Sequence, residues 1–427
     1  MTALFLLGAL FLLLFIGVPI AISLGLASIL TMLLFGDQSL LSSGQKFFHT
    51  MQIYPLLAVP FFILAGAFMT TGGVARRMID FANALVGHYR GGLAMAALLA
   101  SAFFAAVSGS APATVVAVGS VMIVGMVKSG YTKSFAAGVI CNAGTLGILI
   151  PPSIVMVVYG ATTESSIGRL FIAGILPGIV LTMAMMATIV VIAKKQNLPR
   201  QEAVPFREVV KSFREASWGL MLIVIILGGI YAGIFTPTEA AAVAAVYAFF
   251  IAIFVYKDVT LKQVPDVLLD ASKITVMLMF IIANASVFAF LLTAEEIPQA
   301  ASEFVIDLGL PVWGFLIALN LLLLAAGNFL EPISVVLILT PVIFPVAVGM
   351  GIDPIHLGVL MVVNMQIGLV TPPVGLNLFV TSAVAKMPLE DTIKAALPWL
   401  IVLLAVLLLI TFIPWISLVL PALVLDG

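Results

Sequence analysis

The charged residues of this chain are confined to short stretches that separate long apolar runs. Only 9% of the 427 residues are charged and 63% are hydrophobic, whereas a soluble domain has about 25% charged residues. One helical crossing of a bilayer needs about 20 apolar residues. The pattern therefore predicts an all-α integral membrane protein with many crossings. The apolar runs lie near residues 3–35, 55–73, 91–127, 134–163, 168–193, 218–235, 240–256, 274–293, 312–346, 356–385 and 395–421.

The distribution of basic residues predicts how the chain crosses the membrane. Loops rich in Lys and Arg stay on the cytoplasmic side, so we expect the most basic loops there. The stretch 3–35 is either one long helix with a cytoplasmic N-terminus or a helical pair with an external one. Of the 18 Lys and Arg residues, 16 lie in five loops: 74–90, 128–133, 194–217, 257–273 and 386–394.

Two apolar stretches cannot be simple crossings under this assignment. The stretch 91–127 joins two cytoplasmic loops and is interrupted at Ser108-Gly109-Ser110-Ala111-Pro112. The stretch 312–346 lies between two acidic loops on the other side and is interrupted at Gly327-Asn328-Phe329-Leu330-Glu331-Pro332. Each is predicted to be a re-entrant hairpin of two half-helices, one from each face. Irregular backbone at that depth is tolerated only inside protein or beside a wet cavity.

The two halves of the chain repeat each other at a nearly constant offset. Pro112 at the first hairpin tip corresponds to Pro332 at the second, 220 residues later. The run ending in Pro151-Pro152 corresponds to the run ending in Pro372-Pro373, 221 residues later. Because the hairpins face opposite sides, the repeat is inverted. We therefore divide the chain into a first inverted repeat (1–193, with hairpin 91–127 and broken helix 134–163), a cytoplasmic linker (194–217) and a second inverted repeat (218–427, with hairpin 312–346 and broken helix 356–385).

Inverted repeats with discontinuous helices are the recurrent plan of secondary transporters, so transport is the favoured function. A symmetric bundle without a transport role and a channel are the alternatives. A membrane-embedded enzyme is not expected, because the hydrocarbon zone offers one Glu and neither an acid pair nor a metal-binding constellation. The sequence also has no GxxxxGK[ST] phosphate-binding motif, so an ATP-driven pump would need another chain.

The two Pro-Pro pairs predict where helices unwind inside the membrane. Two adjacent prolines remove two N–H donors and break the helical hydrogen-bond ladder, which frees carbonyl oxygens for a cation and exposes the N-terminus of a half-helix. Such N-termini favour anions. Two hairpin tips and two Pro-Pro breaks thus predict two related cation sites flanking one anion site. The alternative for each Pro-Pro pair is a kink that only shapes packing.

Glu331 is the one acid that we place within the hydrocarbon zone, where an acidic residue is a functional candidate by default. Three roles stay open: a cation ligand, a proton relay, or a cap of the half-helix that follows. The hydroxyls of Ser108, Ser110 and Thr114 are candidate oxygen ligands, although hydroxyls in apolar helices often bond back to a carbonyl one turn earlier. Near the breaks, four amides are candidate substrate contacts or satisfied structural groups: Asn142, Asn328, Asn364 and Asn377.

The sequence resembles the large membrane subunit (M subunit) of TRAP (tripartite ATP-independent periplasmic) transporters of the C4-dicarboxylate type. The resemblance covers essentially the whole chain. The most specific stretches are 60–73, Ser108-Gly109-Ser110-Ala111-Pro112-Ala113-Thr114, Gly144-Thr145-Leu146-Gly147-Ile148-Leu149-Ile150-Pro151-Pro152-Ser153, Thr236-Pro237-Thr238-Glu239-Ala240, and 364–377 with its Gly368-Leu369-Val370-Thr371-Pro372-Pro373 core.

The resemblance implies a sodium-driven importer of the bacterial inner membrane, with a transport domain that moves against a scaffold in an elevator mechanism. It implies two partners, a small four-helix membrane subunit and a periplasmic substrate-binding protein, and no cofactor besides two coupling sodium ions. The substrate is expected to be a C4-dicarboxylate, with sialic acid or another organic acid as the alternative.

The resemblance implies that each sodium site combines residues of one hairpin tip with residues of one broken helix. The first sodium site comprises Ser108, Gly109, Ser110, Gly144 and Gly147. The second comprises Gly327, Asn328, Glu331, Gly368 and Thr371. The substrate positions are Thr114, Asn142, Pro152, Asn364, Pro373 and Asn377.

Overall fold

The computed structural model describes residues 2–35, 39–71 and 73–425, and within these ranges the chain forms helices and no strands. This confirms the all-α prediction. The helices are α1 (Thr2–Phe15), α2 (Ile20–Phe35), α3 (Leu40–Met51), η1 (Tyr54–Leu57), α4 (Ala58–Thr71), α5 (Val74–Val86), α6 (Gly92–Ser108), α7 (Ala111–Lys128), α8 (Lys133–Ala143), η2 (Gly144–Ile148), α9 (Ile154–Thr163), α10 (Ile167–Gln196), α11 (Phe206–Ile223), η3 (Val224–Gly228), α12 (Gly229–Tyr231), α13 (Pro237–Phe250), η4 (Ile251–Val255), α14 (Val264–Ala294), α15 (Ile297–Asp307), α16 (Val312–Gly327), α17 (Pro332–Gly349), α18 (Pro354–Gly368), α19 (Leu376–Ala385), α20 (Leu389–Phe412) and α21 (Trp415–Leu425).

Eight helical segments of the described residues are long and apolar enough to cross a bilayer. A helix rises about 1.5 Å per residue, so the 31 residues of α14 are more than long enough for the hydrocarbon core. The chain is a multi-pass membrane protein. The eight segments are Tyr54–Thr71, Ala111–Lys128, Ile167–Gln196, Phe206–Tyr231, Pro237–Val255, Val264–Ala294, Pro332–Gly349 and Leu389–Phe412.

The second half of the structure repeats the helices of the first half in the same order. The helices α6, α7, α8 and α9 begin at residues 92, 111, 133 and 154, and their counterparts α16, α17, α18 and α19 begin at residues 312, 332, 354 and 376. The offsets are therefore 220, 221, 221 and 222. The long helix α10 has its counterpart in α20.

Helices of each repeat pack against helices of the other repeat. The first repeat's α2 packs on α14 of the second, and the second repeat's α13 packs on α4 of the first. The same exchange joins α7 to α19 and α17 to α9. Neither half buries its apolar surface alone, so the core is shared between them.

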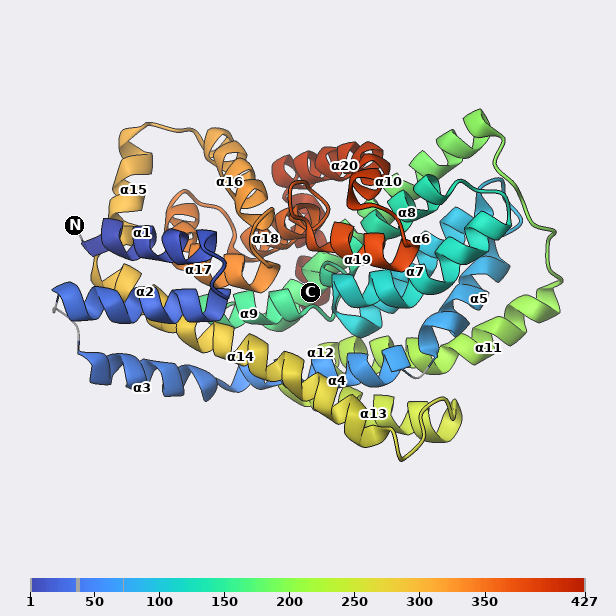
Figure 1. The fold of residues 1–427 in the computed structure, drawn as a ribbon, viewed down its shortest axis with the longest axis horizontal. Coiled ribbons are helices and arrows are strands. Elements are labelled where there is room, and N and C mark those ends of the chain that lie inside the picture. The colour runs from blue at the N-terminus through green and yellow to red at the C-terminus, as the bar shows by residue number, and fades with distance from the viewer. Residues whose placement is uncertain (1, 36–38, 72, 426–427) are drawn as a thin grey trace.

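The helices α2, α3, α4, α13 and α14 form a layer along one side of the molecule, which we call the support layer (Figure 1). The hairpins and broken helices, α6 to α9 and α16 to α19, lie against it and form what we call the core layer (Figure 1). The main helices joining the two layers are α14, which contacts α17, and α4, which contacts α6.

Both predicted breaks within the hairpin stretches are present. The first hairpin consists of α6 and α7, which pack against each other, with residues 109–110 at the tip. The second consists of α16 and α17, which diverge from a tip at residues 328–331: α16 packs mainly on α18, whereas α17 packs mainly on α9 and α14 and less on α18. At the N-terminus, α1 and α2 turn at residues 16–19 and pack together, so the helical-pair alternative holds.

Local sequence sets where several of these helices begin. Ser110, Thr132 and Ser153 each accept a hydrogen bond from a backbone N–H of the following first turn. Such caps satisfy N–H groups that have no partner inside the helix. Pro112 and Pro332 lie in the first turns of α7 and α17, where a missing N–H costs nothing.

The five loops that we predict to be cytoplasmic are joined to one another in the structure. Gln201 N donates to Gly87 O and Tyr131 Oη donates to Pro199 O, each at 3.2 Å. Lys133 Nζ donates to Lys386 O at 2.9 Å, and Arg77 forms an ion pair with Asp258. These contacts connect all five basic loops, which is expected if the loops lie on the same side of the membrane. The end of the predicted linker 194–217 is helical, because α11 runs without a break across residue 217.

Candidate functional site

The tip of the first hairpin brings three hydroxyl-bearing residues together. Gly109 has a φ of +61°, a conformation that glycine adopts without strain and that reverses the chain between α6 and α7. Ser108 Oγ lies 3.2 Å from Thr114 Oγ1 and 3.4 Å from Ser110 O. Thr114 Oγ1 donates to Ser110 O at 2.8 Å. The tip is therefore a compact cluster of oxygen atoms, the ligand type that hard cations take.

The first break packs directly on this tip. The helix stops after η2, the Pro151–Pro152 peptide bond is cis, and α9 begins after Ser153. A Cβ on Gly147 would lie only 2.5 Å from Ser110 O, and one on Gly109 only 2.8 Å from Pro152 O. These glycines let the two irregular segments approach through their backbones, with Gly147 against the carbonyl of Ser110 and Gly109 against that of Pro152.

The second tip and break have the same relationship. A Cβ on Gly368 would lie 2.7 Å from both C and O of Gly327. Thr371, in the unwound segment after α18, donates from Oγ1 to Ile367 O at 2.7 Å. Asn328 Oδ1 is buried without a hydrogen-bond partner among the described residues. A buried acceptor without a donor is costly, and a cation beside it would remove that cost.

Glu331 is the N-cap residue of α17, so its negative charge lies at the positive end of that helix dipole. Its side chain nevertheless forms no hydrogen bond with the backbone N–H groups of the helix. It accepts a hydrogen bond from Ser334 Oγ at 3.1 Å instead. The second carboxylate oxygen is thus left for another ligand.

A cavity of about 470 Å³ lies where both tips, both breaks and the support layer meet. Its lining includes the first residues of four half-helices, at Ala111 (α7), Ile154 (α9), Pro332 (α17) and Leu376 (α19). Four positive helix ends thus converge on one cavity. Its polar lining residues are Thr70, Thr71, Ser108, Ser110 and Glu331. We call this the central cavity.

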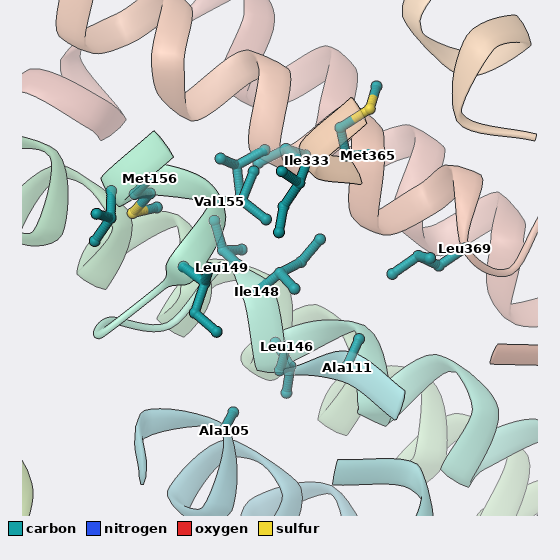
Figure 2. Packing of buried hydrophobic residues seen from close by; sticks show 14 of the residues in the cluster. Ala105, Ala111, Leu146, Ile148, Leu149, Val155, Met156, Ile333, Met365 and Leu369 are labelled. Atoms are coloured by element: carbon teal, nitrogen blue, oxygen red, sulfur yellow. The ribbon is translucent and has the colours of Figure 1, made fainter. Parts of the chain in front are cut away.

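Most of the residues that line the central cavity are apolar. Ile148 of the first break and Val155 of α9 lie close to Ile333 of α17 (Figure 2), and all three line the cavity. Leu369 from the second break lines it as well. Buried apolar side chains of both repeats therefore contribute to the cavity wall.

The predicted site residues divide into two groups by their place in the structure. Ser108, Gly109, Ser110 and Glu331 line the central cavity, whereas Gly144, Gly147, Gly327, Asn328, Gly368 and Thr371 lie in the breaks and the second tip outside its lining. The six predicted substrate positions are also outside that lining. They are Thr114, Asn142, Pro152, Asn364, Pro373 and Asn377.

The three asparagines among those positions are fully buried in helix contacts. Asn142 Nδ2 donates to Ala396 O of α20 at 3.4 Å, Asn364 Nδ2 donates to Asn320 Oδ1 at 2.8 Å, and Asn377 Nδ2 donates to Cys141 O at 3.4 Å. Their donors thus hold helices together. The Oδ1 atom of each has no partner among the described residues.

The support layer contributes cavity residues that sequence reasoning missed. Thr70 and Thr71 at the end of α4 and Ile274, Met277 and Leu278 on α14 line the central cavity. The internal repeat could have pointed to these helices, because residues 61–65 of α4 correspond to residues 279–283 of α14. The repeat marks these helices as a matched pair, but it does not show which of their faces meets the tips.

The family model described as "Tripartite ATP-independent periplasmic transporter, DctM component" matches residues 7–416. The chain belongs to this family. It is therefore a TRAP transporter large permease subunit, a transport protein and not an enzyme, as the sequence predicted.

This TRAP subunit is similar to two relatives of known name and to one solved structure. It is 63% identical to a Pseudomonas aeruginosa protein named C4-dicarboxylate TRAP transporter large permease protein, over 93% of each chain. It is 36% identical to a Vibrio cholerae protein named sialic acid TRAP transporter large permease protein, over 97% of each chain. The crystal structure of the Alcanivorax borkumensis YdaH transporter shares the fold, with a TM-score of 0.61 at 14% identity over 89% of this chain and 88% of that one.

Proposed function

We propose that this TRAP subunit imports C4-dicarboxylates of the succinate, malate and fumarate class, driven by sodium. The observation that carries the proposal is the convergence of four half-helix N-termini on the central cavity. Helix N-termini bind carboxylates through their free N–H groups and their dipoles. In discontinuous membrane helices they point at anionic substrates near the midplane. The name of the 63% identical relative supports the choice of dicarboxylate.

Two oxygen-rich clusters support sodium coupling. The first combines Ser108, Ser110 and the carbonyls beside Gly147, and the second combines the carbonyl of Gly327, Asn328 and the segment around Thr371. Each lies where a tip meets a break, next to the cavity. A cation held at either place would offset the negative charge of a dicarboxylate, so that ion and substrate bind together.

We further propose an elevator mechanism in the bacterial inner membrane. The central cavity lies between the support layer and the core layer, so movement of the core layer along α14 would carry the cavity across the membrane. The family is tripartite by name, which supports two partners, a small membrane subunit and a periplasmic substrate-binding protein. We place the basic end of the molecule in the cytoplasm.

Uptake into proteoliposomes tests this function. Vesicles containing both membrane subunits, with the binding protein outside, are given labelled succinate or labelled sialic acid under an inward sodium gradient or under choline. We expect succinate to accumulate only with the sodium gradient. Equal uptake in choline contradicts sodium coupling, and uptake of sialic acid alone contradicts the substrate class.

A further inference from the structure

A second cavity of about 440 Å³ lies between the support layer and the core layer, apart from the central cavity. Its walls come from α3 (Lys46 and Thr50), from α9 (residues 161–163), from α14 (residues 282–293) and from α17 (residues 337–345). Glu164, which directly follows α9, completes it. We call this the outer cavity, because Glu164 lies on the side opposite to the basic loops.

The outer and central cavities follow one another along the same three helices. On α14 the central cavity is lined at residues 274–278 and the outer cavity at residues 282–293. The same order holds on α9 and on α17. Met277 and Ser286 are nine residues apart, which is about 14 Å along a helix. The two cavities therefore follow one another along the same interface between the support layer and the core layer, which we call the seam.

The outer cavity has one basic and one acidic side chain among its described lining residues, Lys46 and Glu164. The structure records an ion pair for neither of them within the described part of the chain. Lys46 belongs to α3, which is fastened to α14 by a contact of 2.6 Å between Thr50 Oγ1 and Ser286 Oγ. Lys46 is exposed and lines the outer cavity from α3. Its ammonium group, with three N–H donors, therefore offers charge to the cavity and has no ion-pair partner among the described residues.

We propose that the outer cavity is a second carboxylate-binding site, at which a dicarboxylate from the outer side is held by Lys46 before it reaches the central cavity. The proposal rests on the proposed function. Lys46 supplies the charge-assisted hydrogen bond, and the adjoining seam leads to the four helix N-termini. Glu164 faces the same space and repels the anion, so it limits how tightly the substrate is held there and favours its release inward.

Cysteine protection tests the proposal on the full-length chain in proteoliposomes. The one native cysteine, Cys141, is fully buried, which keeps the background reaction low. Thr293→Cys places an exposed thiol in the outer cavity, and Thr70→Cys places one in the central cavity. Gln299→Cys on α15, exposed and outside both linings, is the control. The readout is the rate at which a charged methanethiosulfonate reagent converts the thiol to a mixed disulfide, with methanesulfinate as the leaving group, with and without succinate.

We expect succinate to slow the modification of Thr293→Cys and Thr70→Cys and to leave the modification rate of Gln299→Cys unchanged. Adding Lys46→Gln removes a charge-assisted hydrogen bond, so the succinate concentration that half-protects Thr293→Cys should rise about tenfold, and Lys46→Arg should restore most of the protection. Adding Glu164→Gln should lower that concentration about twofold, because a like charge is removed.

Each outcome decides between the two sites. Protection of Thr70→Cys without protection of Thr293→Cys overturns the outer site and leaves the proposed function standing. Protection of neither thiol by succinate overturns the proposed substrate as well. Protection of Thr293→Cys that is unchanged by Lys46→Gln shows that Lys46 is not the binding group. If Thr293→Cys does not fold, Ser286→Cys on the same wall serves as the reporter.

Discussion

Single glycines decide how closely the two irregular segments of each repeat approach. Sequence reasoning selected Gly147 and Gly368 by family resemblance, and the structure gives the physical reason, since a side chain at either position would overlap backbone atoms of the opposing tip. The sequence could also place Ser108, Ser110 and Glu331, because hydroxyls and an acid stand out in apolar runs. It could not place Thr70, because nothing local distinguishes a hydroxyl that faces a cavity from one that bonds to its own helix, as Thr70 Oγ1 does to Gly66 O at 2.7 Å.

Gly147→Ala should destabilise the fold. The added Cβ would lie 2.5 Å from Ser110 O, a backbone atom that cannot rotate away. Overpacking of this kind costs about 1–3 kcal/mol, which should lower the melting temperature of the purified protein. Gly125→Ala on α7 is the matched control, because its Cβ meets no atom within 4 Å. Equal melting temperatures for the two variants would contradict the close contact.

Glu331→Gln should weaken sodium coupling. The substitution keeps the size of the side chain but removes the charge of a residue that lines the central cavity. Losing one charge-assisted contact should raise the half-saturating sodium concentration for uptake about tenfold. Glu303→Gln, at an exposed position on α15, is the control. An unchanged sodium dependence would reduce Glu331 to a helix cap.

At the scale of elements, the two broken helices were the most predictable part of the fold. Proline acts on its own helix, so Pro151-Pro152 and Pro372-Pro373 show where each helix stops without any knowledge of the rest of the molecule. The divergence of the second hairpin was not predictable. Helices α16 and α17 are similar in length to α6 and α7, so the divergence depends on tertiary packing: α16 packs mainly on α18, and α17 packs mainly on α9 and α14.

Replacing both Pro151 and Pro152 by Ala should abolish uptake while the protein still inserts. Two alanines supply the missing N–H groups and allow α8 and α9 to join, which withdraws the carbonyls from the first tip. Pro177→Ala, inside the long helix α10, is the control and should keep activity. Full uptake by the double variant would show that the break only shapes packing.

At the scale of the whole molecule, the inverted repeat explains why the four half-helix N-termini meet. The exchange of partners between repeats brings α7 against α19 and α17 against α9. Each N-terminus therefore lies beside that of the opposite repeat. The constant offset between the two halves and the charges of the loops predicted the repeat and its hairpins. The shared central cavity depends on how the two halves pack together, which no local sequence pattern encodes.

The topology predicts opposite exposure for two loops of the first repeat. Ser129→Cys lies in a basic loop, and Ser165→Cys lies next to Glu164 at the other end of α8 and α9. A membrane-impermeant maleimide should label Ser165→Cys in intact spheroplasts and Ser129→Cys only after permeabilisation. Labelling of both from outside would contradict the predicted sidedness of the hairpins.

The central claim is that substrate and coupling ions bind where the two tips meet the two breaks. A cryo-electron microscopy map of the assembled transporter in sodium and succinate measures this directly. We predict density for a dicarboxylate between Ser110, Glu331 and α14, with a smaller density at each tip-to-break contact that is lost when choline replaces sodium. A ligand bound away from all four half-helix N-termini, with an empty central cavity, would contradict the account.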